Sequence, residues 1–159
     1  MLAIFPYFIN EFTAYPYKLS IKGEKKMVKM PKEAMDMFND PAASKVLATV
    51  DEKGVLNVVP IGTLSAISEE TIAFAEVFAG KTKENLEKTK KAAATAFKIP
   101  PAGYQIKGTF AGFQTSGALF NKIGKAVKES LGMDIKRVGM IKVEEVYSVG
   151  MPEPGKKIA

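Results

Sequence analysis

The sequence predicts a mainly β fold, a small and mostly antiparallel barrel flanked by two or three helices. Six short segments have the composition or alternation of strands, and turns rich in glycine and proline separate them. Only two or three segments have helical spacing. With 159 residues, 47% of them hydrophobic, the chain is long enough for one domain with one core.

Residues 1–26 precede this domain and show no stable period, although they are rich in aromatic residues. Two interpretations stay open: the segment is an arm that packs on a partner subunit, or translation begins at Met27. We favour the second interpretation, because a conventional domain, residues 27–150, begins directly after the segment. Residues 151–159 are expected to form a flexible tail, since they are rich in proline and glycine.

The domain opens with a helix and a hairpin. Pro31 begins the helix at a position where its missing N–H breaks no helical hydrogen bond, and residues 39–41 (Asn-Asp-Pro) end it. Residues 45–50 alternate as a strand, and a return strand runs from residue 55 to about residue 64. The loop between the two strands ends in Gly54, which we expect in a left-handed conformation.

The return strand carries two residues that are unusual inside a sheet, Pro60 and Gly62. Proline cannot donate to a strand ladder, so this strand is expected at an edge of the sheet or bulged at that point. A third strand follows at residues 71–76. The next helix, from about Thr82 to Lys90, has one large apolar side chain, Leu86, so packing alone justifies it weakly.

The second half of the chain supplies two more strands, residues 92–99 and residues 104–113. The longer one contains Gly108 and Gly112, which indicate a sharp bend of the barrel or a close approach of another backbone.

A long amphipathic helix follows Ser116-Gly117 and is expected to end at Gly132. The last strand, residues 138–149, loses its alternation at Glu144-Glu145, which indicates a bulge.

Composition excludes several classes of chemistry. The chain has no cysteine and no histidine, which removes disulfides, thiolate nucleophiles, the commonest metal ligand and the commonest general base. Redox or acid–base chemistry must therefore come from carboxylates, lysine, tyrosine or a bound cofactor. We expect no metal site, and the sequence indicates no catalytic residue.

The net charge of +6 comes almost entirely from lysine, because Arg137 is the only arginine. Arginine is the usual reader of base edges, so we expect no nucleic-acid partner. No apolar run approaches the ~20 residues of a membrane helix, and we expect a cytoplasmic protein without a membrane partner.

The first candidate site is the start of the second helix, Gly80, Lys81 and Thr82. We expect Thr82 to cap this helix. The unpaired N–H groups and the positive end of the helix dipole would bind an anion, and the Lys81 charge and the Thr82 hydroxyl suit a phosphate monoester. An ordinary capped surface helix explains the same residues.

The second candidate is the run Val59, Pro60, Ile61 and Gly62. Its proline and glycine leave backbone polar groups free for a partner other than a strand, such as the edge of a planar heterocycle. An edge strand protected against aggregation is the alternative explanation.

Together, ATVDEKGVLNVVPIG, the strand after it, GKTKENL and GYQIKGTFAGF resemble the FMN-binding split-barrel family between Lys45 and Val149. This family includes the pyridoxamine 5′-phosphate oxidases and small bacterial FMN-binding proteins. The resemblance implies a six-stranded antiparallel split β-barrel and a homodimer with FMN at its interface. It also implies the cofactor-binding residues: Val59, Pro60, Ile61 and Gly62 beside the ring, Gly80, Lys81 and Thr82 at the phosphate, and Asn85 one turn along.

The chain departs from the true oxidases, which carry an arginine-rich phosphate site and further arginine and histidine residues for their substrate. The lone Arg137 and the absence of histidine argue against pyridoxamine 5′-phosphate oxidation. We expect an FMN-dependent oxidoreductase or electron-transfer protein with a nicotinamide or protein electron donor. Tyr104, Gln105 and Lys107 would face the cofactor or the dimer contact.

Three alternatives stay open: a non-catalytic FMN carrier, a split barrel that binds a deazaflavin, and an interaction domain without a cofactor. Haem is disfavoured because the chain has no histidine or cysteine ligand.

Overall fold

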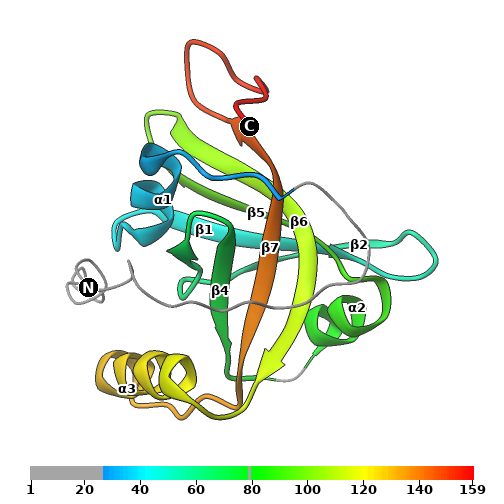
Figure 1. Cartoon of the computed structure of the whole chain (residues 1–159), viewed down its shortest axis with the longest axis vertical. Coiled ribbons are helices and arrows are strands. Elements are labelled where there is room, and N and C mark those ends of the chain that lie inside the picture. Colours follow the sequence, from blue (N-terminus) through cyan, green and yellow to red (C-terminus); the bar gives the residue numbers. More distant parts are fainter. Residues whose placement is uncertain (1–26, 79) are drawn as a thin grey trace.

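The computed structural model describes residues 27–78 and 80–159, so the predictions for residues 1–26 lie outside the described part. The described residues form one antiparallel sheet of seven strands with three helices around it (Figure 1). The strands are β1 (Ser44–Val50), β2 (Leu56–Pro60), β3 (Ser65–Ser68), β4 (Thr71–Glu76), β5 (Lys91–Lys98), β6 (Ala102–Gln114) and β7 (Arg137–Ser148). The helices are α1 (Lys32–Asn39), α2 (Lys81–Thr89) and α3 (Ala118–Leu131).

The sheet is an open, split barrel. Its strand order is β2-β1-β5-β6-β7-β4-β3, so β2 and β3 lie at its two ends, and the long strands β6 and β7 cross its middle (Figure 1). The predicted mainly β split barrel is confirmed.

The predicted count of six strands is wrong, because the return strand ends at Pro60. The chain turns after it, with the Leu64 N–H bonded to the Ile61 carbonyl at 3.2 Å, and the next residues form β3 beside β4. A prolyl nitrogen cannot donate to a ladder, and the turn carries the chain to the opposite end of the sheet.

Two irregularities bend β6 against β7, both at positions where the sequence indicated them. A Cβ on Gly108 would lie 2.0 Å from the Lys142 carbonyl oxygen, so only glycine fits there. Glu144 is the extra residue of a bulge in β7, and a second register shift lies beside Gly112, whose φ is +127°. These irregularities let two long strands curve around one core.

Two apolar cores result. The barrel core holds Phe38, Leu47, Leu86, Ile106 and Ile141, among others. Leu86 of α2 is fully buried, so the one large apolar side chain of that helix anchors it in the barrel. The second core lies under α3, whose apolar face packs on β4 and β7, and the helix ends at Gly132, as predicted, with this glycine in the left-handed conformation.

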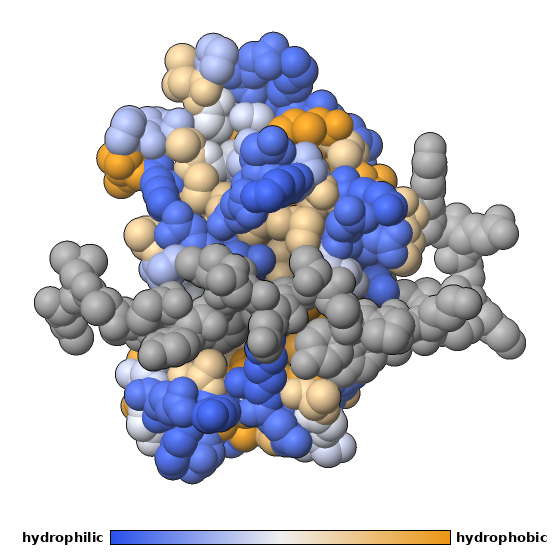
Figure 2. Space-filling model, turned by 60° about the vertical axis from the view of Figure 1, so that its left-hand side comes forward, coloured by the Kyte–Doolittle hydropathy of each residue, from blue (hydrophilic) through white to orange (hydrophobic). Residues whose placement is uncertain are grey.

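The C-terminal tail is bonded to the sheet, and the surface of the domain is mixed in polarity. The tail, residues 151–159, is irregular as its composition indicates, but the Val146 N–H donates to the Ala159 carbonyl at 2.8 Å. Hydrophilic residues are interspersed with hydrophobic ones on the face that Figure 2 shows. In the described part of the chain, every helix is too short or too polar to cross a membrane.

One of the buried charged side chains lies at the α1 end of the barrel. Lys45 on β1 is only 8% exposed, and no described residue accepts a hydrogen bond from its Nζ atom. Burial lowers the pKa of Lys45 to about 8, and nearby Asp40 opposes this shift without reversing it. The Asp40 carboxylate is already paired with Lys98. A buried ammonium without a close partner destabilises the fold.

Replacing Lys45 tests this cost. The pKa of Lys45 falls from 10.5 to about 8 on folding, so both states are charged below pH 8 and the cost is fully present there. Between pH 8 and 10.5 only the unfolded chain keeps the proton, so stability rises with pH. We expect Lys45→Met to raise the free energy of unfolding at pH 7 by about 1–3 kcal/mol and to abolish this rise. Urea unfolding at pH 7 and pH 10 measures both effects.

Lys53→Met is the control, since Lys53 lies exposed in the hairpin turn. Equal responses of the two variants to pH would contradict the burial cost at Lys45.

Candidate functional site

The start of α2 is the first part of the site. The helix begins at Lys81, one residue earlier than predicted, and its N-cap is Gly80. The prediction that Thr82 caps the helix is therefore wrong. Gly80 has an extended backbone and its carbonyl already accepts from the Glu84 N–H at 3.2 Å, which places Thr82 inside the first turn. Among the described residues no side chain caps the helix, so the N–H groups of its first turn stay available to an anion.

A small hydrogen-bond cluster ties this helix to two strands. Asn57 on β2 donates through its Nδ2 atom to the Thr82 Oγ1 atom at 3.0 Å and to the Thr49 Oγ1 atom at 3.2 Å. Asn85 on α2 donates to the same Thr49 oxygen at 3.1 Å. Asn85 is 1% exposed, and its Oδ1 atom has no hydrogen-bond partner among the described residues.

Sequence reasoning placed Thr82 and Asn85 near a ligand but missed Thr49 and Asn57. One signal was available for Asn57, because asparagine is depleted in strands and here it interrupts the apolar run from Val55 to Val59. The contact of Asn57 with Thr82 becomes visible only when β2 and α2 are placed side by side.

Lys81 supplies the cation at the helix start. Its side chain is 50% exposed, and its Nζ atom lies 3.6 Å from Asp51 and 3.8 Å from Glu84. The N–H of Val55, more than the charge of Lys81, holds the pKa of Asp51 below its usual value. Because exposed ion pairs are weak, the ammonium can exchange these carboxylates for a phosphate.

The free edge of β2 is the second part of the site. Within residues 27–78 and 80–159 this strand pairs only with β1, which confirms the predicted edge position. Val59 and Ile61 are half-buried against the barrel core, whereas Pro60 and Gly62 are exposed. The Ile61 N–H donates to Lys45 at 3.0 Å, so in the alternating ladder the backbone of Pro60 faces away from β1.

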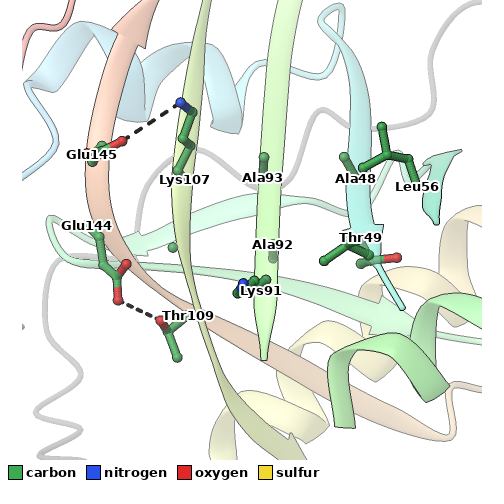
Figure 3. Close-up of a pocket in the computed structure, with 12 residues that line it drawn as sticks. Ala48, Thr49, Leu56, Lys91, Ala92, Ala93, Lys107, Thr109, Glu144 and Glu145 are labelled. Atoms are coloured by element: carbon green, nitrogen blue, oxygen red, sulfur yellow. Dashed lines mark hydrogen bonds and ion pairs between the residues drawn. The ribbon is translucent and has the colours of Figure 1, made fainter. Parts of the chain in front are cut away.

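An open groove of about 420 Å³ crosses the outer face of the sheet (Figure 3). Its lining includes the small residues Ala48, Ala92, Ala93 and Gly108 and the larger residues Leu56, Lys91, Lys107, Thr109, Glu144 and Glu145. Sequence reasoning selected only Lys107 from this set. The other residues lie on five strands, and their juxtaposition depends on the register of the sheet.

The charged end of this groove is internally paired. Thr109 donates to Glu144 at 2.6 Å, and Lys107 lies 3.9 Å from Glu145 (Figure 3). Tyr147 donates to Glu145 at 2.8 Å, and this bond raises the pKa of Tyr147 and lowers that of Glu145. Of the other two predicted contact residues, Tyr104 packs against the barrel core and Gln105 is half-buried.

Comparison with known proteins identifies the family of this chain. A model of the pyridoxamine 5′-phosphate oxidase family matches residues 30–150. The chain belongs to this family. The resemblance read from the sequence is thereby confirmed. No curated protein matches the chain.

Several solved structures have the same fold. HupZ from Group A Streptococcus is 26% identical, with a TM-score of 0.68 over 80% of this chain and 99% of that one. An FMN-binding protein from Syntrophomonas wolfei is 23% identical, with a TM-score of 0.71 over 77% of this chain and 87% of that one. An F420 reductase is 16% identical, with a TM-score of 0.55 over 72% of this chain and 94% of that one.

The single arginine of this oxidase-family chain serves the fold. The Arg137 Nε atom lies 2.8 Å from the Glu76 Oε2 atom, and its guanidinium stacks on Phe113 at 5.2 Å from the ring centroid. The close contact is misaligned for a hydrogen bond, because both buried Glu76 oxygens lack a hydrogen-bond partner among the described residues. The pair is held by charge, and Arg137 is not free to bind a phosphate.

The described residues contain no group of three or more carboxylate, histidine or cysteine side chains that could hold a metal ion.

Proposed function

We propose that this protein binds FMN and acts in oxidation–reduction. The observation that carries the proposal is the uncapped start of α2, with Lys81 and Thr82 in its first turn, hydrogen-bonded through Asn57 to the edge strand β2. An anion-binding helix start and an unpaired strand edge thus lie side by side. A flavin mononucleotide has the two matching groups, a phosphate and a planar ring with polar edges.

The residues at the helix start fit a phosphate monoester. Unpaired N–H groups and the positive end of the helix dipole attract an anion. The Lys81 ammonium adds a full charge, and the Thr82 hydroxyl adds a donor. The Asn85 Oδ1 atom is an unused buried acceptor one turn along, as expected where a ligand with donor groups completes the cluster.

The residues at the strand edge fit a flavin ring. The backbone of Pro60 faces away from β1 and is open to a ligand, and Pro60 prevents another strand from adding at that point. FMN, when bound, supplies the redox chemistry that the side chains of this chain lack. The protein would bind the phosphate, orient the ring against β2 and keep water away from one of its edges.

The relatives support this proposal and also a second candidate. One of the similar structures is described as FMN-binding and another as an F420 reductase, so a deazaflavin is the alternative cofactor. The single arginine, held by Glu76, and the absence of histidine argue against pyridoxamine 5′-phosphate as substrate.

Flavin titration tests the phosphate site. Lys81→Ala should weaken FMN binding by about 1–3 kcal/mol, the usual range for a hydrogen bond to a charged group, measured by quenching of flavin fluorescence. Lys88→Ala is a matched control, because Lys88 is 49% exposed, pairs with Glu84 and Glu52, and lies at the other end of the same helix. Equal effects of the two substitutions would place the phosphate elsewhere.

Reduction under anaerobic conditions tests the redox role. The FMN-loaded protein should lose its absorbance near 450 nm on addition of NADH, of NADPH or of a reduced protein donor, with a rate above that of free FMN. Bleaching by dithionite but by none of these donors would instead support an FMN carrier. A protein that ignores FMN and binds F420 would establish the deazaflavin alternative.

We further propose that the outer face of β2 is covered by a second copy of the chain. Leu56 is 78% exposed and Val58 is 61% exposed on the outward side of this strand, beside the alanine-lined groove. Apolar side chains in this number on one strand are typical of an interface. This face adjoins the proposed flavin edge, so a second subunit would also shield the ring.

Light scattering coupled to size exclusion tests the dimer. We expect twice the chain mass of 17.2 kDa for the natural sequence and a monomer for Val58→Asp, because a buried unpaired charge opposes association. Ile99→Asp is the control, since Ile99 is similarly exposed but lies in the β5–β6 loop. A monomeric natural protein, or a dimer unaffected by Val58→Asp, would contradict this interface.

A further inference from the structure

We infer that Asn57 is a positioning residue, which orients the Thr82 hydroxyl so that its hydrogen is presented to a phosphate at the start of α2. This inference rests on the proposed function, because it concerns how the same site distinguishes a phosphorylated flavin from an unphosphorylated one. Asn57 itself would not touch the ligand.

The amide of Asn57 sets the direction of its hydrogen bonds with Thr82 and Thr49. The carboxamide nitrogen of Asn57 has two N–H groups and no lone pair to accept with. One N–H reaches the Thr82 oxygen at 3.0 Å and the other reaches the Thr49 oxygen at 3.2 Å. Both hydroxyl oxygens therefore act as acceptors toward Asn57.

The hydroxyl hydrogen of Thr82 is the group that would meet the phosphate. Its oxygen is occupied by the Asn57 donor on the barrel side, and the hydroxyl donates to no described protein group. Thr82 is half-buried in the first turn of α2, where the backbone N–H groups are also unpaired. Its hydrogen is left to point away from the barrel, in the same direction as the other donors of the helix start.

Asn57 is held rigidly in this position. Thr49 is 3% exposed, and its hydroxyl oxygen accepts from both Asn57 and Asn85, which fixes the Asn57 amide on the barrel side. Two strands and one helix contribute to this arrangement, so it is formed before any ligand binds. Pre-oriented donors recognise an anion without a cost of reorganisation.

The consequence is selectivity for the phosphate. A hydroxyl locked as a donor strengthens binding of FMN but contributes nothing to riboflavin, which has no phosphate. The ratio of the riboflavin and FMN dissociation constants therefore isolates the contribution of the cluster. A purely structural role of Asn57 would change both constants together.

The experiment measures both dissociation constants by flavin fluorescence for the natural protein, Asn57→Ala, Thr82→Val and the double variant. Asn57→Ala and Thr82→Val are each expected to reduce the preference for FMN by about tenfold, the loss of one hydrogen bond to a charged group. In the Thr82→Val background, Asn57→Ala should cause no further loss. Thr82→Ser, which keeps the hydroxyl, should retain the preference.

Asn39→Ala is the matched control. Asn39 also makes two hydrogen bonds that tie a helix to a strand, to the backbone of Ala66 at 2.9 and 3.2 Å, but at the α1 end of the barrel (Figure 1). It should leave the preference for FMN unchanged, and the midpoints of thermal unfolding would show that all variants are folded.

The outcomes separate two failures. If the natural protein prefers FMN and Asn57→Ala keeps that preference, Asn57 has no positioning role and the proposed function stands. If Asn57→Ala reduces the preference further in the Thr82→Val background, Asn57 acts on the ligand without Thr82, which also overturns the inference. A natural protein that binds neither flavin overturns the proposed function and this inference with it.

Discussion

The proposed site depends on the hydrogen bonds that the buried hydroxyl of Thr49 accepts. This hydroxyl accepts hydrogen bonds from Asn57 on β2 and Asn85 on α2, so one oxygen joins a central strand, an edge strand and a helix. The two outer elements have little else to hold them. β2 has one neighbouring strand, and α2 buries one large apolar side chain, Leu86. Without Thr49, Asn57 and Asn85 would lose a shared acceptor, and the direct hydrogen bond from Asn57 to Thr82 would be the remaining part of this cluster that joins the edge strand to the helix start.

Charge inside this barrel lies at its two ends and away from that cluster. Lys45 sits at the α1 end without a close acceptor, and Glu76 sits at the other end against Arg137. Glu76 is the last residue of β4, directly before the segment that leads to α2. A buried charge pair at this point fixes where β4 stops, although such pairs seldom add stability of their own. The one arginine is thereby used in the fold, which leaves the anion site to lysine, threonine and backbone groups.

Local signals in the sequence predicted most of the fold because the relevant constraints are local. Pro60 excludes a central strand, Gly132 permits the left-handed end of α3, and the lost alternation at Glu144 marks an extra residue. Strand β3, which the sequence did not predict, has four residues. That is too few to show a recognisable alternation next to the turn that precedes it. The cap of α2 was predicted at Thr82, because threonine is a favoured N-cap residue. The N-cap is Gly80, two residues earlier, and it has no side chain to cap with.

The site was predictable only in the parts that lie close together in the sequence. Lys81, Thr82 and Asn85 share one helical turn and its neighbour, so their spacing places them together. Thr49 and Asn57 join them through the β1–β2 register and the packing of α2, which are tertiary facts. The outer groove depends even more on tertiary structure, since five strands must be aligned before its lining exists.

The proposed site consists largely of backbone groups, and this explains why its sequence signature is weak. Helix N–H groups and a strand edge can be supplied by almost any residues that keep the fold, so binding can persist while sequences diverge. Relatives with low identity and the same architecture are what such a site allows. Differences in ligand preference must then reside in the few side chains that orient those groups. In this chain they are Asn57, Lys81 and Thr82, and Asn57 is the one among them that acts entirely through a neighbour.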